Sequence, residues 1–142
     1  MTTSDIRTVG RGLHPVHAVL LGGMFPLFLG GLLSDLAYAS SYQIQWTNFA
    51  SWLIVGGLVF SGFALLWSII ELIRADRRRG QFLVFTLLLF ATWVVGFFNS
   101  LTHAKDAWSA MPMGLILSVI GVLLACASTW LGFAKFGVGG ER

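Results

Sequence analysis

Four long apolar runs limit what this chain can fold into. They extend over residues 17–38, 49–73, 81–102 and 112–136. Each run is close to or longer than the roughly 20 residues that an α-helix needs to cross about 30 Å of hydrocarbon. Only 11% of the 142 residues are charged, against about a quarter in soluble domains, and the mean hydropathy is +0.81. The sequence therefore predicts an all-α fold, an integral membrane four-helix bundle.

The bundle is expected to take up almost the whole chain. We predict a cytoplasmic N-terminal segment over residues 1–13, a four-span transmembrane domain over 14–136 and a short cytoplasmic tail over 137–142. The first apolar run is long and no small-residue cleavage site follows it, so we interpret it as a retained span. Polar turns are expected over residues 39–47, 74–80 and 103–110.

Basic residues predict the orientation of the helices. Eight of the nine lysines and arginines precede the first run, lie between the second and third runs, or end the chain, and only Lys105 lies on the other side. Cytoplasmic loops carry such an excess, so both termini are expected inside a bacterial cytoplasmic (inner) membrane. The arginines of the middle turn are predicted to set the topology and touch anionic headgroups: Arg74, Arg77, Arg78 and Arg79. The charge is too sparse for nucleic-acid binding.

Small residues recur at spacings of three and four in three of the runs. Lipid tails are as apolar as leucine, so helices in a bilayer associate by close packing of small residues and by hydrogen bonds. The third run, rich in Phe and Leu, is expected either to face more lipid or to insert bulky side chains between the other helices. The predicted seams are Gly22, Pro26, Gly30 and Ser34; Gly57, Ser61, Ala64, Ser68 and Glu71; and Gly114, Ser118, Gly121, Ala125, Ser128 and Gly132.

Ionisable residues in or beside spans are costly, so they are the first candidates for function. An inner cluster at the predicted cytoplasmic end comprises His14, His17 and Glu71, with Arg74 nearby. The histidines are candidates for cofactor ligands or for groups that titrate near neutral pH. The alternative is that they cap the first helix and bond headgroups or Glu71. Glu71 itself is expected to accept from a histidine or to pair with Arg74, and the sequence leaves any metal unknown.

An outer cluster comprises Asp35, Asn99 and His103. Asp35 ends the first run, about 27 Å along the helix axis from His17 at 1.5 Å per residue. Asn99 lies one turn before His103, so the two share a helix face. An Asp35–His103 contact would orient the imidazole, or it is only a surface hydrogen bond that ends two helices. Because His103 lies a bilayer away from His14 and His17, the spacing counts against a haem b held by two histidines on facing helices.

No catalytic residue is predicted. The chain has no Gly-x-x-x-x-Gly-Lys, His-Glu-x-x-His or Gly-x-Ser-x-Gly motif. Its single cysteine, Cys126, excludes a Cys-x-x-Cys-His attachment site for c-type haem. We interpret Cys126 as a small buried apolar residue.

The two ends of the apolar region resemble a known family. His14-Pro15-Val16-His17, followed by Phe25-Pro26, resembles the His-Pro-x-His-Pro and Phe-Pro opening of DUF2231, a bacterial membrane family of unknown function. Asp35, the stretch 128–132 and the tail over 137–139 are similar to the family as well, so the resemblance spans about residues 12–139. Ala18 replaces the second proline, and the start of the third run lacks a histidine that many members carry. That departure puts in doubt a metal or haem role depending on this histidine.

The resemblance implies a four-helix membrane protein of unestablished activity and, through relatives found beside redox partners, a redox accessory role. We expect a non-enzymatic accessory or anchoring subunit of a membrane complex. The alternatives are a haem- or quinone-linked electron-transfer subunit using His14 and His17, and a small transporter or proton path using Glu71 and a first helix kinked at Pro26. The expected partners are the lipid bilayer and a second copy of the chain or a membrane redox protein. Haem b is the one cofactor left open.

Overall fold

The computed structural model describes residues 12–77 and 79–137 of the chain. It consists of four long helices, α1 (Pro15–Ser41), α2 (Ile44–Arg74), α3 (Arg79–His103) and α5 (Met113–Phe136), and of one turn of helix, α4 (Ala107–Ala110). The four long helices are each long and apolar enough to cross a membrane. The described ranges contain no strand. The predicted all-α membrane bundle is confirmed.

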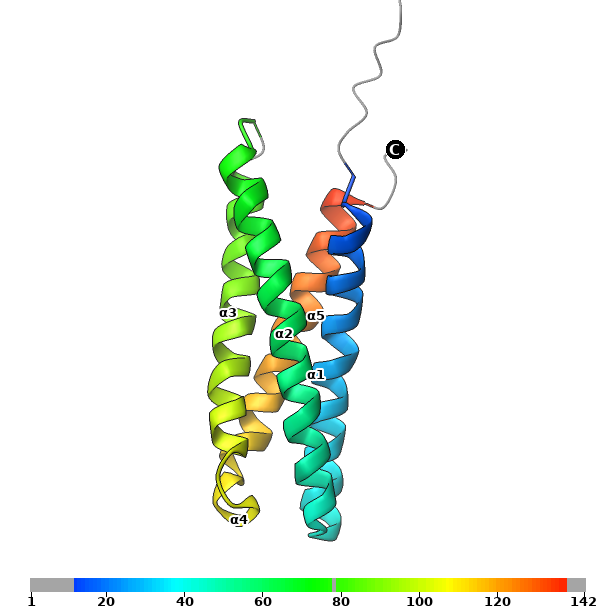
Figure 1. Ribbon diagram of the computed structural model, residues 1–142, viewed down its shortest axis with the longest axis vertical. Helices are drawn as coiled ribbons and strands as arrows, with labels where there is room; N and C mark the ends of the chain where they lie inside the picture. Colours follow the sequence, from blue (N-terminus) through cyan, green and yellow to red (C-terminus); the bar gives the residue numbers. More distant parts are fainter. Residues whose placement is uncertain (1–11, 78, 138–142) are drawn as a thin grey trace, which may run out of the picture.

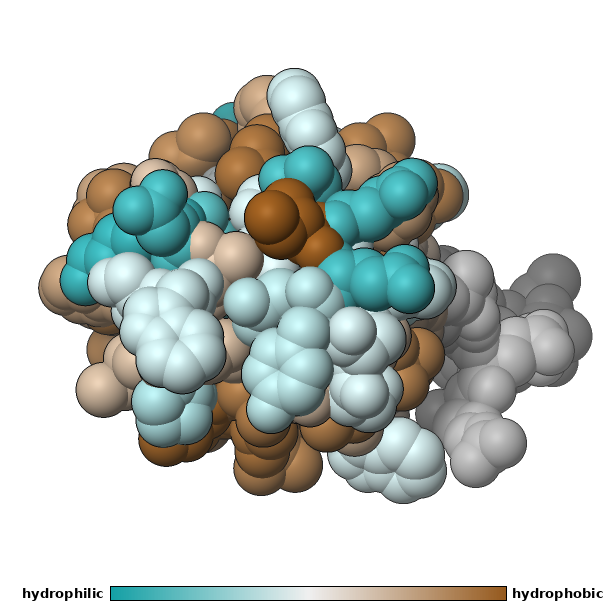
Figure 2. All heavy atoms as spheres, turned by 90° about the horizontal axis from the view of Figure 1, so that it is seen from below, coloured by the Kyte–Doolittle hydropathy of each residue, from teal (hydrophilic) through white to brown (hydrophobic). Residues whose placement is uncertain are grey.

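The helices run up and down beside one another (Figure 1). Both α1 and α3 pack against α2 and α5, which gives a ring in the order α1, α2, α3, α5. The backbone N–H of Leu13 donates to the carbonyls of Phe136 (3.0 Å) and Gly137 (2.7 Å), so the start of α1 is tied to the end of α5. The α2–α3 turn lies at this same end, which we call the inner end (Figure 1). The α1–α2 turn and α4 lie at the opposite, outer end, where Figure 2 shows polar side chains gathered and apolar ones around the flanks.

The turns are shorter than the sequence suggested. The polar stretch 39–47 is helical except for Tyr42 and Gln43. Tyr42 adopts the left-handed conformation (φ 56°), and its N–H donates to the carbonyl of Tyr38 at 2.7 Å, which closes α1. The polarity of this stretch therefore reflects helix ends that project beyond the apolar region, and the predicted nine-residue turn is wrong.

Small residues on α2 and α5 receive large side chains of neighbouring helices. A Cβ added at Gly57 would lie 2.9 Å from Phe28 Cε1, and one at Gly132 would lie 2.7 Å from Leu21 Cδ1. The small residues of the predicted α2 seam are all buried, and so is the whole predicted α5 seam. Side chains that fit this closely against glycine maximise van der Waals contact, which replaces the hydrophobic effect between helices in lipid.

The predicted seam on α1 is partly wrong. Gly22 and Pro26 are exposed, and a Cβ at Gly22 would meet nothing within 4 Å. The buried face is built instead from Met24, Phe28 and Gly31, and Ser34 is the one residue of the predicted seam that is buried. Small residues of α1 lie on more than one face of the helix. Their spacing alone therefore did not identify the face that packs against the other helices.

Helix α3 is not more exposed to lipid than the others. All four spans are buried to the same extent, and Phe85 and Leu89 of α3 are fully buried. Phe85 packs against Gly132 of α5, so the second expectation for this run, bulky side chains inserted between the other helices, is the one that holds.

The prediction for Cys126 is wrong, because this residue follows the buried Ala125 and is exposed on the outside of α5.

Candidate functional site

The outer cluster of Asp35, Asn99 and His103 comes together in the structure, and Ser118 of α5 completes it. All four residues are buried, with 0%, 2%, 5% and 3% of their surfaces exposed, respectively. Nε2 of His103 lies 2.7 Å from Oδ1 of Asp35, and the Ser118 hydroxyl donates to Oδ2 of Asp35 at 2.5 Å. The Asn99 amide nitrogen in turn donates to the Ser118 hydroxyl at 2.9 Å. Three helices, α1, α3 and α5, are thereby joined by side-chain hydrogen bonds.

The geometry limits this cluster to two protonation states. Nδ1 of His103 lies 2.9 Å from the backbone carbonyl of Asn99. A carbonyl only accepts, so Nδ1 must carry a hydrogen. The contact between Nε2 and Asp35 then holds one proton, either as imidazolium with carboxylate or as neutral imidazole with carboxylic acid. Both forms have no net charge, which suits a core from which water is excluded.

The outer cluster is nearly closed to further chemistry. Both Asp35 oxygens, both His103 nitrogens and the Ser118 hydroxyl are engaged in hydrogen bonds. Within this cluster, only Oδ1 of Asn99 lacks a hydrogen-bond partner among the described residues. The sequence-based alternative of a surface hydrogen bond is wrong, because Asp35 and His103 are both buried and α1 continues to Ser41. Ser118 was recognised only as a packing residue, since a serine spaced by four from Gly114 gives no sign of its acceptor.

The inner cluster is also assembled, but more loosely. His17 is fully buried, and its Nδ1 lies 3.6 Å from Oε2 of Glu71, whose side chain is 29% exposed. That distance suits an ion pair but is too long for a hydrogen bond. Glu71 also accepts from Nε1 of Trp67 at 3.1 Å. Both ion pairs found within the described ranges are histidine–carboxylate pairs, so Glu71 pairs with His17 rather than with Arg74.

His14 caps α1, as one of the two sequence-based alternatives proposed. Its Nδ1 accepts from the backbone N–H of Val16 at 3.3 Å, and Pro15 occupies the first helical position, where a missing N–H costs nothing. The His14 ring also lies over Trp67, with ring centroids 4.7 Å apart. Cap and aromatic contact together fix how the chain enters the bundle.

His17 is the most costly residue of the inner cluster. Neither ring nitrogen has a hydrogen-bond partner among the described residues. Each unpaired buried polar group costs about 1–3 kcal/mol. The rings of Trp67 and Phe85 lie 6.1 Å and 5.7 Å from the imidazole, centroid to centroid. Side chains of the chain itself therefore enclose the imidazole. No group of three His, Cys, Asp or Glu side chains within 12–77 and 79–137 is placed to hold a metal ion.

Two hydroxyl pairs lie between the clusters. Ser68 and Thr86 join α2 to α3 with their oxygens 2.5 Å apart, and Thr92 and Ser128 join α3 to α5 at 3.1 Å. The two threonines were not predicted from the sequence. Thr92 lies seven residues, about two turns, before Asn99 and so shares its helix face, whereas Thr86 is turned toward α2. Along the axis of α3, Thr86 and Thr92 are about 9 Å apart and Thr92 and Asn99 about 10.5 Å apart, at 1.5 Å per residue. The fully buried Leu89 lies between Thr86 and Thr92. The polar residues therefore do not form an unbroken hydrogen-bonded path.

The basic residues divide between the two ends of the bundle. Arg74, Arg77 and Arg79 are exposed around the α2–α3 turn, at the inner end. Lys135, also exposed, lies in the last turn of α5 at that end, whereas Lys105 lies at the outer end. Arg78 falls outside the described residues. Arg7, Arg11 and Arg142 also fall outside the described residues, so the structure places four of the eight grouped basic residues at the inner end, and the orientation stays a prediction.

Comparison with known families agrees with this architecture. The model of a family described as "Predicted membrane protein (DUF2231)" matches residues 13–139, which include all five helices and both clusters. No curated protein and no solved structure matches the chain.

Proposed function

Because the chain belongs to the DUF2231 family of predicted membrane proteins, we propose that it is a non-enzymatic accessory or anchoring subunit of a complex in the bacterial inner membrane, with both termini in the cytoplasm. The observation that carries the proposal is that the ionisable side chains buried within the described spans serve to join helices. Asp35 contacts His103, and Glu71 contacts His17. Such contacts are the usual polar links between membrane helices.

The remaining surface supports the same conclusion. The α1–α2 turn has two residues, and α4 is the one helix outside the spans within the described ranges. Little of the described chain therefore projects from the bilayer. The outward faces of the spans carry large apolar side chains, such as Phe63 on α2 and Leu123 on α5. A partner of this protein is therefore itself embedded in the membrane.

The experiment uses the one cysteine of the chain, Cys126, which is exposed on α5. A photoactivatable thiol probe is attached to Cys126 in native membranes at the natural expression level, and Cys126→Ala is the matched control. The expected product is an adduct with one other membrane protein, which also co-migrates with the chain after solubilisation in mild detergent. A chain that migrates alone, or only as copies of itself, contradicts the accessory role. So does turnover of a substrate by the purified chain alone.

Two alternatives have separate tests. Electron transfer through haem predicts a Soret band in protein purified after haem-replete expression, and its loss in His17→Leu. Because Trp67 and Phe85 enclose His17, we expect no such band. Transport or a proton path through Glu71 predicts a flux that Glu71→Gln abolishes. The apolar Leu89 between the hydroxyl pairs favours no flux through the bundle.

A further inference from the structure

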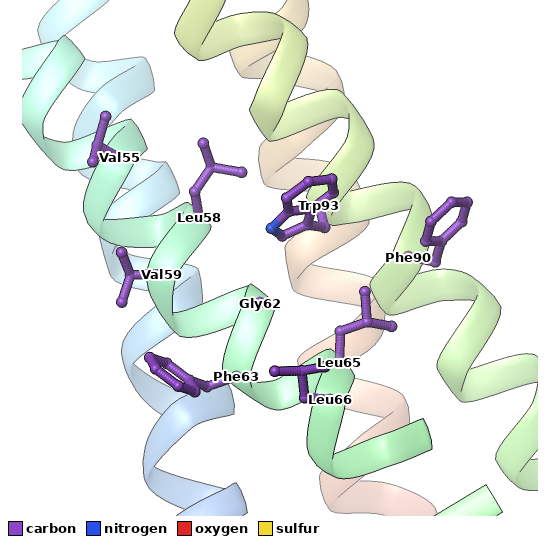
Figure 3. Close-up of a pocket in the computed structure, with 9 residues that line it drawn as sticks. All are labelled: Val55, Leu58, Val59, Gly62, Phe63, Leu65, Leu66, Phe90 and Trp93. Carbon is purple, nitrogen blue, oxygen red and sulfur yellow. The ribbon is translucent and has the colours of Figure 1, made fainter. Parts of the chain in front are cut away.

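A groove runs along the lipid-facing side of the seam between α2 and α3 (Figure 3). Its volume is about 540 Å³, within the range of pockets that hold small molecules. Phe63 and Leu66 of α2 and Phe90 of α3 stand along it and are each more than half exposed. Gly62 and Trp93 face each other across its floor (Figure 3).

The groove offers one polar group, the indole N–H of Trp93. Trp67 donates its N–H to Glu71, but Nε1 of Trp93 has no acceptor among the described residues. A Cβ added at Gly62 would lie 3.3 Å from this nitrogen, so glycine leaves the N–H uncovered. The nitrogen is turned toward α2 in Figure 3.

The depth of Trp93 decides what can satisfy this donor. Trp93 lies about 21 Å from Arg79 and about 15 Å from His103 along α3, at 1.5 Å per residue. Neither water nor lipid headgroups reach that depth, and an unsatisfied group in hydrocarbon costs several kcal/mol. A lipid tail has no acceptor. Helix carbonyls can take a second hydrogen bond, as Leu21 does from the Thr129 hydroxyl, but Trp93 Nε1 makes no such contact among the described residues. The group that fits is an acceptor carried by a lipid-soluble molecule.

We propose that this groove binds a lipid-soluble quinone. One ring carbonyl accepts the hydrogen of Trp93 Nε1, and the flat ring lies over Gly62 with Phe63 and Phe90 beside it, where aromatic contacts are favourable. The apolar tail follows the groove along α2. The proposal is one of binding, and it places the ligand in the middle of the membrane, away from His14 and His17. It is independent of the accessory role.

The test measures binding of decylubiquinone to the chain in nanodiscs, with decylbenzene as a ligand that has a ring and tail but no carbonyl. The wild-type chain is expected to bind decylubiquinone saturably and more tightly than decylbenzene. Trp93→Phe keeps the ring but removes the N–H, and one neutral hydrogen bond corresponds to roughly 2- to 10-fold weaker binding. Gly62→Leu fills the groove and is expected to abolish binding. The matched control is Trp130→Phe on α5, where the indole is 76% exposed away from the groove.

Equal affinity for the two ligands, or an unchanged affinity in Trp93→Phe, would overturn the hydrogen bond on which the proposal rests. Loss of binding in Trp130→Phe would show that the site lies elsewhere. Since Gly62→Leu risks misfolding, an azido-quinone is also photolysed on the wild-type chain. Labelled peptides are expected from α2 and α3, and labelling confined to α1 or α5 contradicts the site.

Discussion

Replacing Asp35 separates hydrogen bonding from charge at the outer cluster. Asp35→Ala removes the acceptor of two buried contacts, with Nε2 of His103 at 2.7 Å and with the Ser118 hydroxyl at 2.5 Å. Hydrogen bonds between membrane helices average about 0.6 kcal/mol and reach about 1.7 kcal/mol, whereas bonds to charged groups in soluble proteins contribute about 1.5–3 kcal/mol. Both contacts here are short and fully enclosed, so we expect a loss of about 3 kcal/mol in the free energy of unfolding.

Asp35→Asn is expected to behave differently. Nδ1 of His103 is held as a donor by the Asn99 carbonyl, so a neutral imidazole presents a lone pair at Nε2. The new amide nitrogen donates to Nε2, and the amide oxygen accepts from Ser118. Both contacts survive without any charge, so the free energy of unfolding is expected to fall by less than about 1 kcal/mol.

The measurement is SDS-driven unfolding in mixed micelles, followed by circular dichroism. The control is Asp106→Asn, because Asp106 is an exposed carboxylate in the turn before α4. A double-mutant cycle between Asp35→Ala and His103→Ala isolates the pair and should give a coupling above about 1 kcal/mol. The reasoning fails if Asp35→Asn costs as much as Asp35→Ala, since charge rather than hydrogen bonding would then hold the cluster.

Three further predictions concern packing, burial and topology. Gly132→Ala places a Cβ 2.7 Å from a leucine methyl and is expected to destabilise the bundle by about 1–3 kcal/mol, whereas Gly22→Ala meets nothing within 4 Å and should be neutral or stabilising in the same unfolding assay. His17→Leu removes two buried nitrogens that make no hydrogen bond within the described residues, together with the 3.6 Å ionic contact to Glu71, and is expected to leave stability unchanged or raise it by about 1 kcal/mol; a loss above about 2 kcal/mol would mean that the contact with Glu71 outweighs the cost of burying the imidazole. Replacing Arg77 and Arg79, together with the arginine between them, by glutamine should give mixed topologies in reporter fusions, and a single unchanged topology would refute the proposed orientation.

The sequence predicted the helices and two of the three small-residue seams because both depend on local composition. Hydrophobic length alone identified all four spans. On α5 the glycines and serines form a single stripe, so the face that packs was unambiguous. On α1, Gly22 and Gly23 belong to competing stripes, and only contact with the other helices selects between them.

Most hydrogen-bond partners on neighbouring helices could not be predicted from the sequence, for a different reason. The pairing of Asp35 with His103 was anticipated, because each ends or nearly ends an apolar run on the same side of the membrane. Ser118 and Thr86 gave no such sign, since serine and threonine are common in membrane helices and bond to their own backbone as readily. Whether a hydroxyl crosses to another helix depends on interhelical distance and rotation, which composition does not encode.

The positions of the polar contacts also bear on the groove. Helix α2 is linked to α3 by the Ser68–Thr86 pair and to α1 by the Glu71–His17 pair, both toward the inner end. From Val55 to Leu66, where α2 borders the groove, no described side-chain hydrogen bond crosses to another helix, since the Ser61 hydroxyl donates to the carbonyl of Leu58 in its own helix. Widening the seam here breaks no described hydrogen bond between helices and exposes mainly apolar side chains to lipid, which costs little because lipid is as apolar as they are. Widening it beyond Ser68 would leave two buried hydroxyls without partners. The chain can therefore admit a ligand between α2 and α3 in the middle of the membrane while its inner end stays closed.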